Sequence, residues 1–143
     1  MKNFIRTGCM VLAAAAMFTS CKDDDKSRTE LLTSGNWKIV SDQSRVGNGA
    51  WQEDIGTYDP CELDNYAKFS EANTVAFNEG PTKCDPLDDQ EYVLPWSFVN
   101  GEDQISVAGE VYTIDELNGS TLTLSTSEVI GSTTYYYRQT LKH

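Results

Sequence analysis

Histidine is nearly missing from this chain of 143 residues, in which His143 is the one example. Histidine is the side chain that most often transfers protons in catalysis. The chain also contains no Gly-x-Ser-x-Gly elbow, no P-loop and no HExxH motif. Carboxylates are abundant, but no spacing pairs two of them as a general acid and a general base. We therefore expect a protein that is not an enzyme, with no catalytic residue and no cofactor.

Basic residues are also scarce, with 11 Lys and Arg against 22 Asp and Glu, which gives a formal net charge of −11. A surface with this excess of negative charge repels the phosphates of nucleic acids and of anionic lipid headgroups. We therefore exclude both as direct partners of the protein.

Long apolar runs are missing after residue 18, so no later segment is apolar enough to cross a membrane. The run at 7–18 is about a dozen residues long, which is too short for a spanning helix. It follows the basic segment 1–6 and leads into small residues before Cys21. This order resembles the bacterial lipobox, which implies that 1–20 is a lipoprotein signal peptide and that Cys21 is lipidated. An ordinary secretory signal peptide and a buried helix are the alternatives.

Residues 22–25, Lys-Asp-Asp-Asp, directly follow this cysteine. They resemble the export signal that sends lipoproteins of the Bacteroidota to the outer face of the outer membrane, and a plain hydrophilic linker is the alternative. The resemblance implies an acidic tether over 21–30 and a lipid-anchored protein of the outer membrane, exposed on the cell surface. Without residues 1–20 the chain has a net charge of −13, so its membrane attachment depends on the lipid anchor itself.

Cysteines are few, and only Cys61 and Cys84 remain after the lipidation site. An even pair in an exported protein predicts a disulfide, which would stabilise the fold by roughly 3 kcal/mol. A redox or metal-binding pair is the alternative, but the spacing is not CxxC and no second pair supports zinc. We expect no metal site, and we interpret the acidic loop as solvated charge rather than as calcium ligands: Asp85, Asp88, Asp89 and Glu91.

Helical periodicity is also rare, because alternating apolar and polar residues dominate the chain after a short helical turn expected over 29–32. Turn signals separate five successive strands between 92 and 138: Asn100-Gly101, Ala108-Gly109, Asn118-Gly119 and Gly131-Ser132. The Asn-Gly and Gly-Ser pairs suit primed two-residue turns. Eight or nine strands in about 110 residues, without a long crossover, favour an all-β, antiparallel up-and-down β-barrel over 31–143. A β-sandwich is the alternative fold.

Alternation along the expected strands predicts which side chains face the barrel interior. A small barrel of this kind is either filled by such side chains or holds one small ligand. The inward set is Trp37, Ile39, Phe69, Val75, Phe77, Leu94, Trp96, Phe98, Ile105, Val107, Leu122 and Leu124.

The start of the first expected strand carries a Gly-x-Trp signature, and further features follow in order: Leu31-Leu32, Gly35-Asn36-Trp37, Cys61 before the Phe69 strand, Cys84, and the Trp96 strand. This set resembles the lipocalin-like domain of secreted lipoproteins of the Bacteroidota, over about residues 31–141. The resemblance implies that Arg138, on the last strand, packs over Trp37 in a cation–π contact.

Two functions fit these features. In the first, the barrel holds a small apolar or amphipathic molecule, for which we select five candidate ligand-binding residues: Trp37, Phe77, Trp96, Phe98 and Tyr137. In the second, the protein is a structural or protein-interaction module without an internal ligand, and Tyr135, Tyr136 and Tyr137 offer a surface to an unidentified protein partner.

Overall fold

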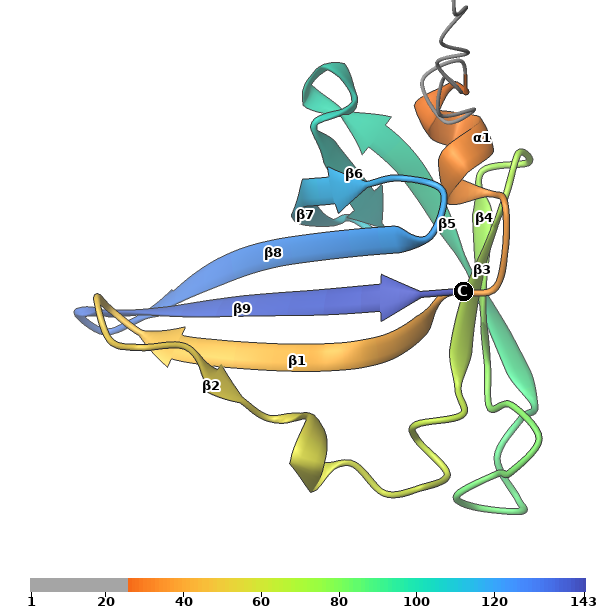
Figure 1. Ribbon diagram of the computed structural model, residues 1–143, viewed down its shortest axis with the longest axis horizontal. Helices are drawn as coiled ribbons and strands as arrows, with labels where there is room; N and C mark the ends of the chain where they lie inside the picture. The colour runs from red at the N-terminus through yellow and green to blue at the C-terminus, as the bar shows by residue number, and fades with distance from the viewer. Residues whose placement is uncertain (1–25) are drawn as a thin grey trace, which may run out of the picture.

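The computed structural model describes residues 26–143 as one antiparallel β-sheet preceded by a short helix (Figure 1). The predicted signal peptide, the predicted lipidation site Cys21 and the first residues of the expected tether lie outside the described residues. The elements are α1 (Arg28–Leu32), β1 (Lys38–Val46), β2 (Gln52–Glu53), the 3₁₀ turn η2 (Ile55–Thr57), β3 (Tyr66–Ser70), β4 (Thr74–Asn78), β5 (Glu91–Val99), the 3₁₀ turn η3 (Asn100–Glu102), β6 (Gln104–Val107), β7 (Glu110–Leu117), β8 (Thr121–Ile130) and β9 (Thr133–Lys142).

Helix α1 begins at a capping box and buries its last two residues. The Ser27 hydroxyl accepts a hydrogen bond from the Glu30 amide at 3.2 Å, and the Glu30 carboxylate accepts one from the Ser27 amide at 2.7 Å. Leu31 and Leu32 are buried against the end of the sheet. The indole Nε1 of Trp37 donates to the Leu32 carbonyl at 2.7 Å, which ties α1 to the start of β1. Within residues 26–143, no helix is long and apolar enough to cross a membrane.

The strand order is β2-β1-β9-β8-β7-β6-β5-β4-β3, and every neighbouring pair is antiparallel. Strands β3 to β9 therefore follow one another as a meander, and β1 returns beside β9. This order confirms the predicted all-β antiparallel meander and lacks the crossed sheets of a β-sandwich. Figure 1 shows β8, β9 and β1 side by side, running across the direction of β3 and β4.

The prediction of a closed barrel is wrong, because β2 and β3 remain at the two edges of the sheet. One isolated bridge joins Trp37 to Ala67 of β3, with N–H···O distances of 2.8 and 2.9 Å. The register of β1 shifts between Ile39 and Ser41, and farther along the strand β2 pairs with Gln43 and Ser44. Because β2 takes that edge of β1, the pairing with β3 does not continue.

The predicted primed turns are only partly present in the second half. Gly131-Ser132 joins β8 to β9 as a two-residue turn with φ of 65° at Gly131, whereas the longer turn η3 replaces a two-residue turn at Asn100-Gly101. Ala108 and Gly109 both have positive φ, 51° and 93°, as a type I′ turn requires. Asn118 does not; its side-chain oxygen instead accepts from the amides of Ser120 and Thr121, both at 2.9 Å. An Asx-type turn therefore replaces the primed turn at this position.

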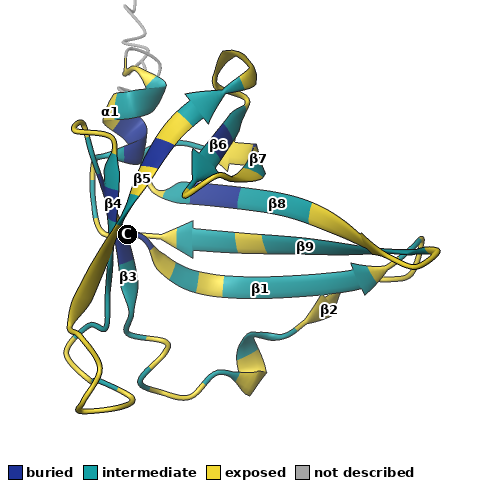
Figure 2. Ribbon diagram, turned by 180° about the vertical axis from the view of Figure 1, so that it is seen from behind, coloured by how far each residue is buried: buried dark blue, intermediate teal, exposed yellow. Residues whose placement is uncertain are grey.

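The apolar core lies where the strands crowd together near α1, and Figure 2 shows buried segments in β3, β4, β5, β6 and the start of β8. Apart from Ile39, which is half-buried, every residue of the predicted inward set is buried or packs against the core. The predicted set left out further members of the core in the strands: Ala67, Tyr112, Ile114, Leu117 and Leu141. The opposite end of β8 is exposed, whereas the end of β9 beside it is half-buried (Figure 2).

The predicted disulfide between Cys61 and Cys84 is confirmed, with a Cα–Cα distance of 5.3 Å. It connects the loop before β3 to the loop after β4, as the sequence predicted. The same two loops also touch at Gly80, where a Cβ atom would lie 2.8 Å from the carbonyl carbon of Asp64. The bridge therefore holds two long loops together beside the core.

Candidate functional site

The core-bearing face of the sheet contains a hollow of about 350 Å³, which we call the inner hollow. Ile39 and Leu141 contribute apolar surface from the start of β1 and from β9, and the fully buried Trp37 lies next to them. Phe77 and Tyr92 form a second apolar surface as a stacked pair, with ring centroids 5.1 Å apart and an interplanar angle of 16°. The polar residues of the lining come mainly from the disulfide-linked loops and their strand ends: Tyr58, Glu62, Asn65, Tyr66, Asn78, Glu79 and Gln139.

A hydrogen bond between Tyr58 and Asp42 lies beside the inner hollow. The Tyr58 hydroxyl donates to Oδ2 of Asp42 at 2.6 Å. Burial of the phenol, together with this hydrogen bond and the charge of Asp42, raises the pKa of Tyr58 above its ordinary value. Asp42 and Gln139 also line a smaller hollow of about 200 Å³ toward Tyr112 and Tyr137. The Tyr58–Asp42 pair therefore stands between a mostly apolar hollow and a more polar one.

The smaller hollow contains two tyrosines whose hydroxyl groups are held by carboxylates. Tyr112 donates to Glu110 at 2.7 Å, and Tyr137 donates to Glu128 at 2.6 Å. Burial and then the Glu110 carboxylate raise the pKa of Tyr112 to about 12. The hydrogen bond to Glu128 raises the pKa of Tyr137. Both phenols therefore stay neutral and act as hydrogen-bond donors at ordinary pH.

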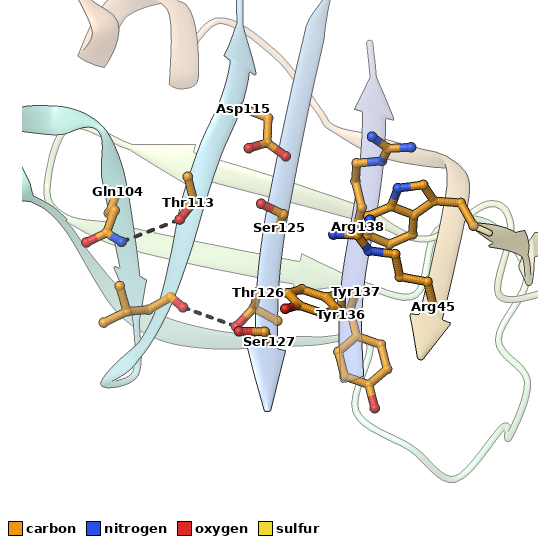
Figure 3. A pocket seen from close by; sticks show the side chains of 12 residues that line it. Arg45, Gln104, Thr113, Asp115, Ser125, Thr126, Ser127, Tyr136, Tyr137 and Arg138 are labelled. Atoms are coloured by element: carbon orange, nitrogen blue, oxygen red, sulfur yellow. Dashed lines mark hydrogen bonds between the residues drawn. The ribbon is translucent and has the colours of Figure 1, made fainter. Parts of the chain in front are cut away.

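The opposite face of the sheet carries a second large hollow, of about 450 Å³, which we call the outer trough (Figure 3). Direct register partners on five adjacent strands form a polar row across it: Gln43, Arg138, Ser125, Thr113 and Gln104. Because Leu141 faces the core, alternation along β9 turns Arg138 to this opposite face. The side chains in the middle of the row are small and those toward both ends are larger, so an open space, the trough, remains between them.

Two arginines stack on aromatic rings at the β1 end of the outer trough. The Cζ atom of Arg45 lies 4.7 Å from the ring centroid of Trp51 and 4.5 Å from that of Tyr136. The Cζ atom of Arg138 lies 4.5 Å from the Trp51 centroid. Gln43 accepts from Nε and Nη2 of Arg138 at 3.1 and 2.6 Å. These contacts hold both guanidinium groups in place.

The structure divides the predicted ligand-binding residues among three environments. Trp37 and Phe77 line the inner hollow. Trp96 and Phe98 instead pack edge to face, with centroids 5.2 Å apart, and belong to the core or its margin. Tyr137 lines the smaller hollow and the outer trough. The five residues therefore do not form one site.

The predicted contact of Arg138 with Trp37 is also wrong. Arg138 stacks on Trp51 on the outer face, whereas Trp37 lies in the core and is fully buried. Trp37 meets His143 in an edge-to-face contact at 4.5 Å, and the His143 ring also lies 3.1 Å from the Ser34 hydroxyl through Nε2. The reason is register: the start of β1 lies opposite Lys142 and Leu141, so residues at the end of β9 reach Trp37 and Arg138 does not.

Several residues of these hollows escaped sequence reasoning. Tyr58 approaches the inner hollow from a loop, where no periodic signal exists. Tyr92 shares the alternation of Leu94 and Trp96 in β5, and this signal could have placed it on the inner face.

Arg45 and Trp51 were also missed. Alternation from Trp37 and Ile39 would place Arg45 on the inner face, but the register shift between Ile39 and Ser41 turns it to the outer face. Among residues 26–143, no group of three or more His, Cys, Asp or Glu side chains is arranged to hold a metal ion.

A comparison with protein families matches residues 33–124 to the lipocalin-like domain. The chain belongs to the lipocalin-like family. The matched segment begins directly after α1 and ends within β8. It includes the disulfide and all the apolar residues of the inner hollow except Leu141. A lipocalin-like fold is typical of binding proteins rather than enzymes. A comparison with curated proteins gave no match.

Proposed function

We propose that this lipocalin-like protein binds one small, partly apolar molecule in the inner hollow. The observation that carries the proposal is the apolar lining of this hollow, in which Ile39 and Leu141 lie together with the stacked Phe77 and Tyr92. Ligand sites are typically concave and largely apolar, with a few polar groups and a volume of about 300 Å³ or more. The hollow of about 350 Å³ therefore suits a small ligand rather than a long lipid chain.

The polar lining restricts the chemistry of this ligand. Asn65, Asn78 and Gln139 offer amide groups to a polar end of the ligand, while Glu62 and Glu79 add negative charge. A carboxylate or phosphate there would be repelled by these acids. We therefore favour a neutral or cationic amphipathic molecule, with its apolar part against Ile39 and Leu141.

Native mass spectrometry of protein purified from its host tests whether it carries such a molecule. In addition, the neutral fluorescent probe N-phenylnaphthylamine should bind the purified protein. Tyr92→Ala removes one stacked ring and should weaken probe binding by about tenfold, because an aromatic contact and its buried area are lost.

Val93→Ala is the matched control, since Val93 neighbours Tyr92, faces the other side of β5 and is equally exposed at 55 %. It should leave probe affinity unchanged. Two results together would rule out the inner hollow as a ligand site. The purified protein would carry no small molecule, and it would bind the probe no more tightly than the Tyr92→Ala variant does.

We further propose that residues 1–20 are a lipoprotein signal peptide and that lipidated Cys21 anchors the protein in the outer membrane, facing the cell surface. The order of basic, apolar and small residues before Cys21 supports the lipidation, and Lys22 with the acidic run after it supports surface export. Cys21→Ser should abolish labelling by radioactive palmitate, whereas Cys9→Ser should retain it. If the protein is exposed on the cell surface, proteinase K should digest it on intact cells. Protection from the protease would mean that the protein lies on the inner side of the outer membrane.

The alternative role as an interaction module has one structural observation in its favour. The end of the β8–β9 hairpin and the end of β1 expose apolar side chains, with Val129 at 69 %, Ile130 at 59 % and Val46 at 53 % exposure. Crosslinking on intact cells through this hairpin should then give one recurrent neighbour. Diffuse crosslinks, unchanged in Val129→Ser, would count against this role.

A further inference from the structure

We propose that the outer trough is a second binding site, which takes a hydroxylated organic carboxylate, with a sugar acid as the simplest class. It lies on the face of the sheet opposite to the inner hollow, and it requires a negatively charged ligand where the inner hollow disfavours one. The proposal therefore does not depend on a ligand in the inner hollow.

The first argument is the state of the Arg45 guanidinium. Its hydrogen-bonding groups have no partner among residues 26–143, and its Nε is buried without one. The ring faces of Trp51 and Tyr136 hold the group instead. Arginine offers five N–H donors in a planar fork that fits a carboxylate. Arg45 is thus positioned by aromatic rings while its exposed donors remain available for a ligand.

The second argument is the proximity of two positive charges. Arg138 and Arg45 lie 4.5 and 4.7 Å from the centre of the same Trp51 ring. No carboxylate among the described residues lies within ion-pair distance of either, although the whole chain carries a net charge of −11. Two like charges that share one ring repel each other, and a bound anion would relieve this repulsion. The local charge of the trough is therefore opposite to that of the protein.

The neutral amide of Gln43, held in turn by Glu53, fixes Arg138 for this role. Gln43 accepts from Arg138 and donates through its own amide to Glu53 at 3.2 Å. The Glu53 carboxylate also accepts from the Ser41 hydroxyl at 2.7 Å and from the Asp42 amide at 2.9 Å. Glu53 is thereby occupied by neutral groups. Its carboxylate holds Gln43 in place without neutralising Arg138.

The remainder of the trough suits hydroxyl groups rather than a second charge. Ser125 and Thr113 continue the row from Arg138, and Asp115 lies beside them on β7 (Figure 3). Serine and threonine hydroxyls both donate and accept, whereas a carboxylate such as Asp115 only accepts. A simple inorganic anion would leave Asp115 unused and close to its own charge. A molecule with a carboxylate at one end and hydroxyls at the other satisfies both ends.

Titration of the isotope-labelled protein with glucuronate, followed by amide and arginine side-chain NMR signals, tests the proposal. Glucuronate should shift the signals of Arg45, Ser125 and Arg138 and leave bound N-phenylnaphthylamine in place. Glucose, which lacks the carboxylate, and acetate, which lacks the hydroxyls, should each bind at least about tenfold more weakly. Raising the salt concentration should weaken glucuronate binding, because its charge is screened.

Arg45→Gln and Arg138→Gln should each weaken glucuronate binding at least about tenfold. Lys38→Gln is the matched control, since it removes one positive charge from the same strand as Arg45 but outside the trough. Arg45→Lys keeps the positive charge without the planar fork, so it should bind glucuronate with intermediate affinity. If Arg45→Gln does not fold, Arg45→Lys takes its place in the test. Equal shifts with glucose or acetate, shifts outside the trough, or full affinity in Arg45→Gln would overturn the proposal.

Discussion

At some glycines of this protein, a single added Cβ atom decides whether another residue can be accommodated. Gly80 is one of them, because it combines a left-handed backbone, with φ of +67°, and a close approach to the backbone of Asp64. Gly101 has nearly the same φ, +68°, but nothing lies within 4 Å of the position of its Cβ atom. The two glycines therefore separate backbone strain from steric conflict.

Gly80→Ala is expected to destabilise the protein more than Gly101→Ala. The left-handed conformation alone should cost about 1 kcal/mol in Gly101→Ala. Gly80→Ala adds a clash with the Asp64 backbone, for which about 1 to 3 kcal/mol more is expected. Urea unfolding followed by circular dichroism measures both free energies. Equal costs for the two variants would mean that the loop around Asp64 moves freely.

The hydroxyl group of Tyr58 predicts the behaviour of the protein in alkali. Its pKa is raised in the fold by burial and by Asp42, so the unfolded protein loses this proton first, near pH of about 10. The contribution of the Tyr58 hydroxyl to the free energy of unfolding is fully present below that pH, and this free energy should fall as the pH rises further. Tyr112, with its pKa raised to about 12, acts in the same direction.

Tyr58→Phe should show a smaller loss of unfolding free energy above pH of about 10 than the unsubstituted protein. Asp42→Asn keeps the phenol but removes the neighbouring charge, so the tyrosinate absorbance of Tyr58 should appear at lower pH than before. An identical pH dependence in all three proteins would show that this hydrogen bond does not persist in solution.

At the scale of elements, two loops that belong to no strand form the polar border of the inner hollow. Residues 58–65 and 79–90 are joined by the Cys61–Cys84 bridge, and they contribute Tyr58, Glu62 and Asn65 to that border. Long loops lose much conformational entropy when they become ordered, so a covalent connection between them stabilises this arrangement.

Replacing both cysteines by serine should lower the free energy of unfolding by about 3 kcal/mol. Probe binding in the inner hollow should also weaken, because the border residues are no longer held near β3 and β4. The unsubstituted protein with reductant should behave like the double variant in urea unfolding and in probe titration. If reduction lowers stability but leaves probe affinity intact, the loops do not shape the site.

At the scale of the whole molecule, a single strongly bent sheet has one end with a core and one end without. The buried residues lie near α1, while β8, β9 and β1 continue beyond the core as a three-stranded extension (Figures 1 and 2). Amides of Ile105, Ile114 and Leu122 should therefore exchange with solvent only through global unfolding. Amides of 127–130 should exchange through local opening, at lower free energy. Hydrogen exchange followed by NMR checks this, and uniform protection would refute it.

Much of the core could be predicted because it depends on local alternation. Val75, Phe77, Leu94 and Trp96 face inward for the same reason that any strand presents alternate residues to one face. The disulfide could also be predicted, since Cys61 and Cys84 are the two cysteines that follow Cys21 in the sequence. These inferences need no knowledge of which strands are neighbours.

Features that depend on distant pairing could not be predicted in this way. The contact of His143 with Trp37 follows from the register of β9 against β1. The contact of Arg138 with Trp51 also depends on the path of the chain after β1, which brings Trp51 back to the sheet. Barrel closure failed for the same reason, because β2 pairs with β1 where β3 would have continued. The sequence contains no local signal for such choices.

The sequence alone thus determined the strand pattern, the meander, the core face and the disulfide, because each follows from nearest neighbours along the chain or from the number of cysteines. The tertiary structure decided where the sheet remains open, where space is left between side chains, and which residues surround that space. The size of a hollow depends on how closely side chains from distant strands pack together. The alternation of apolar and polar residues along a strand is the same whether the space that the sheet encloses is filled or empty.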